Sequence, residues 1–394
     1  MGKKKRFQPE TEKQEENKQS NEVFNGDCDS EEPKRKKKKK QKRSQSETEH
    51  QEQTKQSNEV FNGDANTEEP KRTKKKKKNK HHSEEIKVIP TVSIAIPSSI
   101  IGNAQSDELA TRLAGQIARA ATIFRIDEVV VFDNNSTSRD DPTTTNMGTS
   151  EGDRRNAAFF IRILRYLETP QYLRKHLIPR HSNLRCVGLL PPLDAPHHLR
   201  KHEWASYREG VTLQEKAPNS VGTLVDVGLD KNVVIDKALE SGTRVTVAMG
   251  TDRNLSTGTL LQVVDPSTPR EQEGMYWGYK VRYAPNLSSV IENCTYEGGY
   301  DYVIGTSEHG QVIKSSELCV PAFRHLLIAF GGLAGLEECI EQDKKLKGKD
   351  ASFVFHSYLN LCPHQGSRTI RSEEAVFIAL QYFQEPVERA LQKS

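Results

Sequence analysis

Three segments near the carboxyl end of the chain combine glycine with small polar residues in a way that suits ligand binding. They are GTSEHG (305–310), FGGLAGLE (330–337) and NLCPHQGSRTIRSEEA (360–375). Because glycine has no Cβ, main-chain N–H and C=O groups in such segments can approach a ligand closely. A lining of this kind suits an adenine or an amino-acid-like cofactor better than a triphosphate. The alternative is that these glycines only form tight turns.

Motifs of several common reactions are absent from the sequence. It has no GxxxxGK[ST] phosphate-binding loop, no GxGxxG after the first expected strand, no GxSxG nucleophile elbow and no HExxH metal motif. His197, His198 and His202 have helical spacing but lack a pattern of acidic partners, so we expect no metal site.

Apolar runs precede all three glycine-containing segments, and we expect each run to be a strand. The runs are YDYVI (300–304), FRHLLIAF (323–330) and SFVFHSYLNL (352–361). Ligands of open parallel sheets bind beyond the carboxyl ends of the strands. The three segments should therefore meet at one edge of a sheet, which becomes the candidate site.

The first ordered part of the chain reads as a strand, a helix and a second strand. TVSIAIP (91–97) is a short apolar run, and IDEVVVFDN (126–134) is typical of a strand covered on both faces. Between them, residues 106–124 have an apolar helical face, with Ser106 as the expected N-cap. This order predicts a parallel βαβ unit.

Residues 191–286 have a different sequence pattern, in which short runs of alternating apolar and polar residues are separated by Gly and Pro. We expect five strands here, the last of them YWGYKVRYA (276–284), forming a small inserted barrel of the OB type. One face of such a barrel often holds single-stranded nucleic acid. Alternatively, the aromatic side chains pack inside the barrel. The candidate RNA-contacting residues are Arg208, Lys216, Arg244, Tyr276, Trp277, Tyr279, Lys280, Arg282 and Tyr283.

Residues 1–87 form an expected disordered tail with an internal duplication, because the segment at 18–40 recurs at 55–78. Residues 1–89 have 25 Lys and Arg, 18 Asp and Glu, and no Trp, Tyr or Leu, so they cannot bury enough apolar surface to fold. The lysine runs predict nuclear or nucleolar import and non-specific phosphate contact. The alternative is a solubilising tail without a partner.

The remaining 305 residues have 33 Lys and Arg against 36 Asp and Glu, a net charge of −3 that is unlike a generic RNA binder. The longest apolar stretch, HLLIAFGGLAGL, is too short to span a membrane, and no membrane partner is expected. The six cysteines form no CxxC pair, which favours reduced thiols in the nucleus or cytoplasm.

The glycine-containing segments resemble the three cofactor loops of the SPOUT superfamily, which are S-adenosylmethionine-dependent RNA methyltransferases with a carboxyl-terminal trefoil knot. QGSRTIR (365–371) is the most specific stretch, and the resemblance extends over residues 88–386. It implies an α/β fold in which a knotted parallel-sheet domain is formed by residues 88–190 and 287–388. The OB-like β-barrel (191–286) would be inserted between them.

The resemblance also implies roles for individual residues. Arg368 would orient a phosphate or a polarised base, and Glu373 or Glu374 would accept a proton or pair with an arginine. Alternatively, the two glutamates only stabilise a helix N-terminus, and His309 or His364 accepts the proton. The residues expected to hold S-adenosyl-L-methionine are Gly305, Thr306, Glu308, Gly310, Gly331, Gly332, Asn360, Leu361, Cys362 and Gln365.

The expected substrate is an unpaired or flipped nucleotide in structured RNA, because a paired base cannot reach such a site. By analogy with related ribosomal-RNA enzymes, N3 of uridine is the first acceptor to consider. The superfamily resemblance further implies a homodimer. With a net charge of −3, the folded part should cluster its basic residues locally, or the tail should supply the phosphate contacts. A scaffold associated with the spindle or kinetochore, keeping the fold without turnover, is the alternative function.

Overall fold

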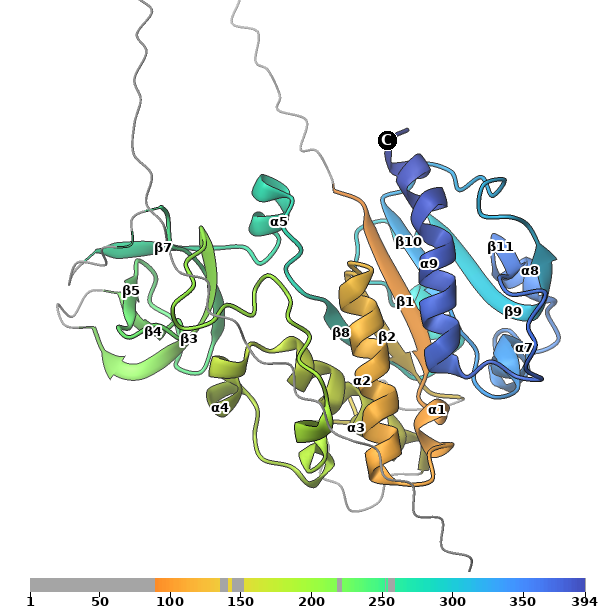
Figure 1. Ribbon diagram of the computed structural model, residues 1–394, viewed down its shortest axis with the longest axis horizontal. Helices are drawn as coiled ribbons and strands as arrows, with labels where there is room; N and C mark the ends of the chain where they lie inside the picture. Colours follow the sequence, from red (N-terminus) through yellow and green to blue (C-terminus); the bar gives the residue numbers. More distant parts are fainter. Residues whose placement is uncertain are drawn as a thin grey trace, which may run out of the picture. The chain divides into compact units, whose positions relative to one another are not determined.

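A computed structural model of the chain describes residues 89–134, 141–143, 152–217, 222–251, 253 and 259–393. The tail, with its duplication and lysine runs, lies outside these residues. Within them the chain forms a six-stranded sheet and a closed five-stranded barrel (Figure 1). None of the described helices is both long enough and apolar enough to cross a membrane.

The sheet is parallel throughout and has the order β11-β9-β10-β1-β2-β8. Its central strand β1 is followed by α2 and then by β2, which pairs with β1, so the βαβ prediction is confirmed. Ser106 caps α2 by accepting a hydrogen bond from the backbone N–H of Leu109. The strands are β1 (Thr91–Pro97), β2 (Glu128–Phe132), β8 (Lys280–Ala284), β9 (Tyr302–Val312), β10 (His325–Ala329) and β11 (Ser357–Asn360).

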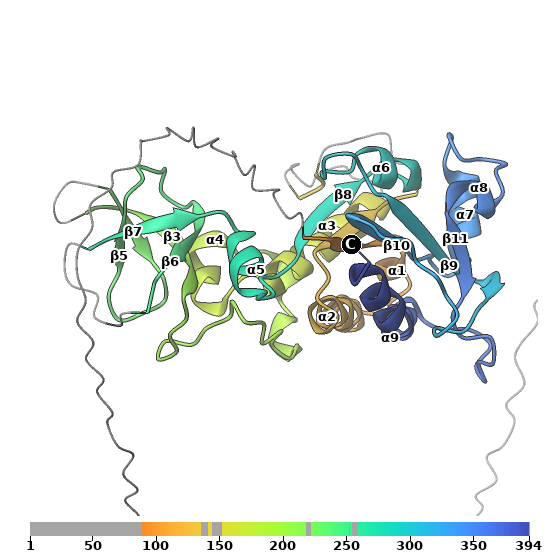
Figure 2. The ribbon, with the colours of Figure 1, turned by 90° about the horizontal axis from the view of Figure 1, so that it is seen from above.

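Helices cover both faces of the sheet, as Figure 2 shows. One face packs against α2 (Asp107–Ile123), α3 (Gly152–Glu168) and α9 (Ser372–Leu391) in a single apolar cluster. The other face packs against α6 (Leu287–Glu292) and α7 (Gly335–Gln342). Burial on both faces explains why β1, β2 and β10 are nearly continuous apolar runs in the sequence. The short helices are α1 (Ser99–Gly102), α4 (Arg174–Leu177), α5 (Thr268–Glu273) and α8 (Ala351–Val354).

Two of the expected strands have different bounds. We expected a strand over 300–304 followed by a loop, but β9 continues to Val312 with a break in its pairing. Tyr358 of β11 is opposite Gly305, whereas the next residue, Leu359, is opposite Gln311, so residues 306–310 leave the sheet as a bulge. The strand expected from residue 352 was also too long, because its first part folds as α8 before β11 begins.

The barrel has the strand order β3-β4-β5-β7-β6 and is closed. The prediction that residues 280–284 complete it was wrong, because this strand is β8 and pairs in parallel with β2 at the edge of the sheet. The alternating pattern of β8 fits an edge strand as well as a barrel strand, so periodicity could not separate the two. The barrel strands are β3 (Tyr207–Lys216), β4 (Thr223–Asp226), β5 (Val233–Ile235), β6 (Arg244–Ala248) and β7 (Leu260–Val264).

Candidate active site

The three glycine-containing segments meet in one pocket of about 380 Å³, at the carboxyl ends of β9, β10 and β11. The predicted convergence on one edge of the sheet is therefore confirmed. The bulge of β9 forms one wall, the turn between β10 and α7 forms the second, and the chain between β11 and α9 closes the third. The expected cofactor residues in its lining are Thr306, Glu308, Gly331, Gly332, Asn360, Leu361, Cys362 and Gln365.

The turn between β10 and α7 requires glycine at two positions. A Cβ on Gly331 would lie 2.3 Å from the carbonyl carbon of Gly335, far inside contact distance. Gly335 itself has φ +78°, a left-handed conformation that disfavours other residues. Because the backbone folds back on itself this tightly, main-chain groups of the turn come close to the pocket at this wall.

Gly305 precedes the bulge and Gly310 ends it, and both pack against the elements behind it instead of lining the pocket. A Cβ on Gly305 would lie 2.6 Å from the ring of Phe355, and one on Gly310 would lie 2.4 Å from the carbonyl carbon of Leu359. Both glycines are therefore explained by close approach between β9 and the chain leading into β11.

Side-chain amides and hydroxyls fix the pocket segments to one another. Asn360 Nδ2 donates to the carbonyl oxygen of Glu308 over 2.7 Å, and Asn360 Oδ1 accepts from the N–H of Cys362. Thr306 Oγ1 donates to the carbonyl oxygen of Ala329 over 3.0 Å. Asn360 and Thr306 thus hold the three segments in register.

A carboxylate that we did not single out in the sequence also lines the pocket. Glu337, in the first turn of α7, accepts a hydrogen bond from Ser307 Oγ over 2.7 Å, and its Oε1 lies 3.0 Å from His309 Nδ1. Partial burial acts to raise the pKa of Glu337, but its polar neighbours Tyr358, Ser307 and His309 outweigh this and hold that pKa below its ordinary value. In return, the carboxylate raises the pKa of His309.

The acidic residues expected to take part in catalysis lie at the start of α9, outside the pocket lining given by the described residues. The carboxylate of Glu374 accepts from the N–H of Arg371 as part of a capping box, and buried Glu373 lies 3.6 Å from an Arg371 guanidinium nitrogen. Arg368 is exposed on the segment that precedes the helix, and His364 is exposed beside it. Five residues were predicted to transfer a proton or to orient the substrate: Arg368, Glu373, Glu374, His309 and His364. Of these, His309 is in the pocket lining given by the described residues.

Comparison with known proteins decides the class of this chain. A family model described as "Putative RNA methyltransferase" matches residues 91–383, which contain both the sheet and the barrel. The chain belongs to this family. RNA methyltransferases move a methyl group from a bound donor to RNA, so the fold must hold a methyl donor and admit an RNA nucleotide.

Curated relatives are similar over about three quarters of this chain, and two of those given below carry a more specific name. A human protein named 28S rRNA (uridine-N(3))-methyltransferase is 47% identical over 74% of this chain and 77% of its own length. A Drosophila melanogaster protein of the same name is 45% identical over 76% of this chain and 62% of its own length. A putative methyltransferase of Caenorhabditis elegans is 35% identical over 74% of this chain and 79% of its own length.

Three of the four aromatic residues expected on an RNA-binding face of this methyltransferase are buried instead. Tyr276, Trp277 and Tyr279 are each at most 9% exposed, and their polar atoms donate to Ile126 O, Glu209 Oε1 and Leu164 O. They lie in the chain that runs from the barrel back to the sheet. These three residues are buried as the alternative supposed, but they pack between the barrel and the sheet and not inside the barrel.

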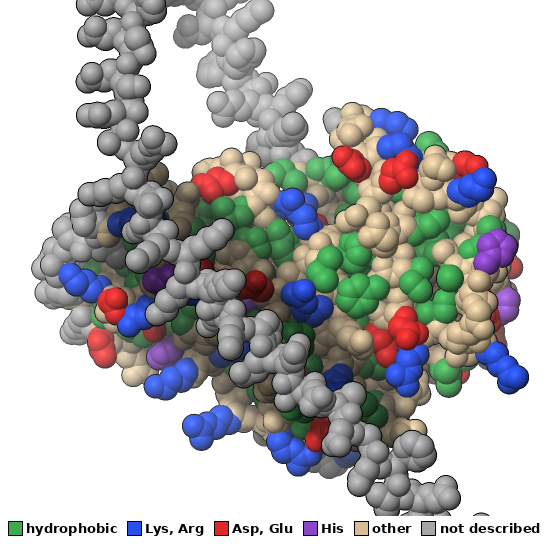
Figure 3. Space-filling model, viewed as in Figure 1, with side chains coloured by type: hydrophobic (Ala, Val, Ile, Leu, Met, Phe, Trp, Pro, Cys, Tyr) green, Lys and Arg blue, Asp and Glu red, His purple; other side chains and the backbone are tan. Residues whose placement is uncertain are grey.

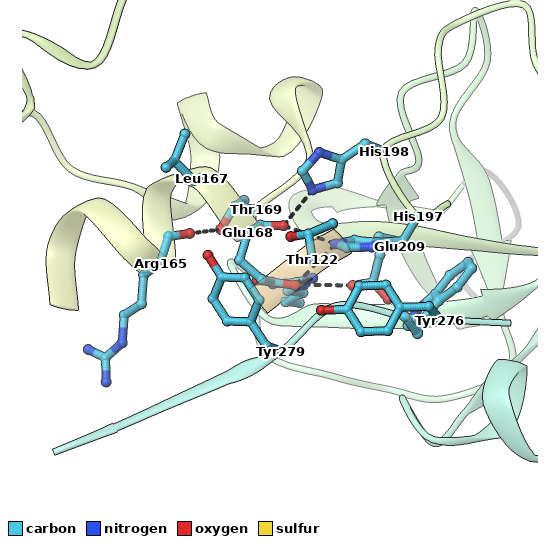
Figure 4. Close-up of polar contacts among 12 residues, drawn as sticks. Thr122, Arg165, Leu167, Glu168, Thr169, His197, His198, Glu209, Tyr276 and Tyr279 are labelled. Atoms are coloured by element: carbon cyan, nitrogen blue, oxygen red, sulfur yellow. Dashed lines mark hydrogen bonds and ion pairs between the residues drawn. The ribbon is translucent and has the colours of Figure 1, made fainter. Parts of the chain in front are cut away.

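Two of the arginines that were expected to contact RNA are already bonded to other groups of the protein in the same region. Arg244 of β6 makes a bidentate ion pair with Glu168 at the end of α3, with guanidinium nitrogens 2.6 and 2.9 Å from the carboxylate oxygens. It also pairs with Glu209. Arg208 is 1% exposed and donates to main-chain carbonyls. Figure 4 shows how Glu168 and its neighbours join α3 to the barrel. Arg244 therefore fixes the barrel to α3, Arg208 holds the segment that leads into the barrel, and neither is a free phosphate contact.

The histidines considered as a metal-like group belong to this cluster too. His197 is fully buried with its Nε2 3.0 Å from the carbonyl oxygen of Glu168, and His198 contacts the same oxygen at 2.7 Å. Burial, followed by the charge of His197, lowers the pKa of His198 to about 4. His202, in contrast, is exposed.

Proposed function

We propose that this protein uses S-adenosyl-L-methionine to methylate N3 of a uridine in large-subunit ribosomal RNA. The observation that carries the proposal is the pocket in which the three glycine-containing segments meet, in a chain that is 47% identical to a protein named for that reaction. A pocket of about 380 Å³ is within the range of cofactor sites, and its lining combines the glycine turn at Gly331 and Gly332 with polar residues.

The pocket divides naturally into a part for an adenine ring and a part for an amino-acid end. The main-chain groups of Leu361, with Gln365 near them, suit the ring, whose edge both donates and accepts hydrogen bonds. The N–H of Cys362 already binds Asn360 and its carbonyl oxygen accepts from the N–H of Gln365, so Cys362 would help to shape this part of the pocket. The turn at Gly331 and Gly332 leaves room for the remainder of the cofactor, and Thr306 holds the wall that faces it. Gly305, Glu308, Gly310 and Asn360 would contribute by shaping these walls.

The cofactor, when bound, supplies a methyl group already activated on a sulfonium. The enzyme's own residues then have to position the acceptor nitrogen in line with that methyl group and exclude water. As the bond from methyl carbon to N3 forms and the carbon–sulfur bond breaks, the N3 proton must leave. His309, 72% exposed at the pocket and held through Nδ1 by Glu337, can take that proton on Nε2.

The residues at the start of α9 have supporting roles in this proposal. Arg368 is exposed and is available to orient a phosphate or the uracil ring. Glu373 and Glu374 act through the helix start that they stabilise with Arg371. The arrangement favours His309 over these two carboxylates as the proton acceptor.

The finer features of the fold belong to the same proposal. The barrel order β3-β4-β5-β7-β6, with a parallel pair between β5 and β7, supports an OB-like barrel. Family membership supports a knotted carboxyl-terminal part and a homodimer. Leu333 is 79% exposed in the pocket lining, which also supports contact with a second copy. A ribosomal RNA substrate agrees with a nuclear or nucleolar location, whereas additional cytoplasmic or spindle and kinetochore association stays a prediction.

The test is methylation of unmodified large-subunit rRNA transcript by the purified full chain with S-adenosyl-L-methionine, followed by mass-spectrometric nucleoside analysis. The expected product is 3-methyluridine at one position. A different methylated nucleoside would overturn the proposed acceptor. If the cofactor raises the melting temperature but no nucleoside is methylated, the scaffold alternative replaces the enzyme.

A further inference from the structure

The segment between α3 and β3 has the opposite charge from the rest of the folded chain. We call residues 169–206 the connector. It contains six Lys and Arg against two Asp and Glu, a net charge of +4, whereas the other residues from 90 to 394 have 27 against 34, a net charge of −7. A protein that must bind a polyanion with an acidic body has to place its cations together, and this segment is where they are placed.

The connector cations are mostly exposed. Arg174 is the exception, since its guanidinium lies 4.3 Å from the Tyr166 ring centre and donates to main-chain carbonyls. Figure 3 shows Lys and Arg side chains along the lower edge of the molecule, in the area where Figure 1 places α4. The exposed cations of the connector are Lys175, Arg180, Arg185, Arg200 and Lys201.

The connector is fixed to the fold although it has no strand and no long helix. Asn183 accepts from Arg162 of α3 over 2.6 Å, and Leu193 O accepts from Arg119 of α2 over 2.6 Å. Near its end, Arg208 of β3 donates to Arg200 O over 3.0 Å. Between these contacts the connector forms only short helical turns, among them α4, so its contacts with the rest of the fold hold its course. Its cations therefore stand on a preformed surface that loses little entropy on binding.

The middle of the connector reaches the edge of the sheet on which the pocket opens. Arg185 is 3.4 Å from Asp107 in the first turn of α2. The preceding helix, α1, follows the carboxyl end of β1, and its Ser99 lies beside the pocket residue Gly332, with 3.0 Å between the hydroxyl and an ideal Cβ. RNA bound along the connector thus runs toward the pocket edge.

We infer that the connector is the surface by which the folded part of this enzyme binds the phosphate backbone of its RNA substrate. This inference rests on the proposed function for the identity of the RNA, but not for the contact itself. Lys175, Arg180 and Arg200 are its main contacts, because none of the three forms an ion pair with a described residue, whereas Lys201 is 2.5 Å from Asp230. Phosphate contacts position the RNA, and the pocket selects the nucleotide.

The test measures the affinity of the full chain for an unmodified large-subunit rRNA transcript at several salt concentrations. In the triple variant K175A/R180A/R200A, the slope of log Kd against log salt should fall by about 2 to 3, since each lost phosphate contact removes about 0.7 to 0.9. The matched control is K344A/K347A/K349A, which removes the same charge from exposed lysines between α7 and α8. The tail is unchanged in both variants, so any RNA binding by the tail contributes equally to the two measurements.

Equal slopes for the two variants would overturn the inference. The charge-preserving variant K175R/R180K/R200K should bind as the wild type does, which excludes a folding defect when the melting temperatures also agree. Failure of the proposed function would give a different result. The wild type would then bind this RNA with a steep salt dependence that the connector variant reduces, but would leave the RNA unmethylated. That outcome would refute the reaction and support the connector as the RNA-binding surface.

Discussion

His309 Nδ1 lies 3.0 Å from Glu337 Oε1, across the pocket wall that the β9 bulge and the start of α7 form together. This contact fixes the orientation of the imidazole ring and directs Nε2 away from the carboxylate. It also raises the pKa of His309, first through the hydrogen bond and then through the charge of Glu337. A histidine so placed is suited to accept a proton near neutral pH.

Replacing His309 by Ala should reduce kcat by about 10²- to 10⁴-fold, the usual contribution of a proton acceptor. Glu337→Gln should act differently, because it removes the charge that raises the pKa of His309. The neutral ring then exists at lower pH, so the acidic limb of the kcat/KM profile should move to lower pH. His364→Ala is the control, since His364 is exposed outside the pocket lining. Wild-type kcat in His309→Ala would refute the role.

Gly332→Arg should abolish binding of S-adenosyl-L-methionine. Gly332 lines the pocket and its ideal Cβ already lies 3.0 Å from Ser99 Oγ, so the long side chain must enter the cofactor's space. Gly366→Arg is the matched control, because no atom lies within 4 Å of its ideal Cβ. Calorimetric titration with the cofactor separates the two. Equal affinity in both variants would place the cofactor elsewhere.

The sequence was informative wherever a pattern had one structural cause. The buried runs of β1, β2 and β10 predicted a parallel sheet, and the three segments after its strands predicted the pocket. Glu337 was missed because an acidic residue in a first helical turn is explained by the helix dipole alone, and its contact with His309 joins segments 28 residues apart.

The barrel could be predicted only in part, for physical reasons. Four of its strands alternate clearly, but β7 has an exposed end, with Leu260 48% exposed, and gives a weak signal. The adjacent aromatic-rich stretch was the stronger pattern and was assigned to the barrel. In the sequence Tyr276 and Trp277 look like nucleic-acid contacts. The same residue types also pack between structural elements, so the sequence alone cannot separate the two roles.

Gly310→Ala should destabilise the fold by about 1 to 3 kcal/mol, the usual cost of forcing an extra carbon into a packed interior. The added Cβ would lie 2.4 Å from the carbonyl carbon of Leu359, and backbone atoms cannot yield as a flexible side chain can. Gly188→Ala is the control, because its ideal Cβ has no atom within 4 Å. Urea unfolding of both variants checks the prediction, and equal midpoints would contradict it.

The contact between Arg244 and Glu168 should dominate the attachment of the barrel. Arg244→Met leaves the Glu168 carboxylate, whose side chain is 11% exposed, without its main partner, and this should cost about 3 to 5 kcal/mol in the free energy of unfolding. Arg185→Met, which breaks an exposed pair with Asp107, should cost less than about 1 kcal/mol. A similar loss in the free energy of unfolding for the two variants would show that the pair between Arg244 and Glu168 stabilises the fold no more than an exposed pair does.

The same pair gives the unfolding free energy a defined pH dependence. Burial alone would raise the pKa of Glu168, but Arg244 and His197 outweigh it and hold that pKa well below the ordinary value of 4.5. Since the folded state binds this proton less readily than the unfolded state, the stabilisation is complete above about pH 4.5 and is lost as the pH falls further. Glu168→Gln should therefore flatten the acidic decline measured by urea unfolding at several pH values. An unchanged decline in Glu168→Gln would assign the acid sensitivity to other carboxylates.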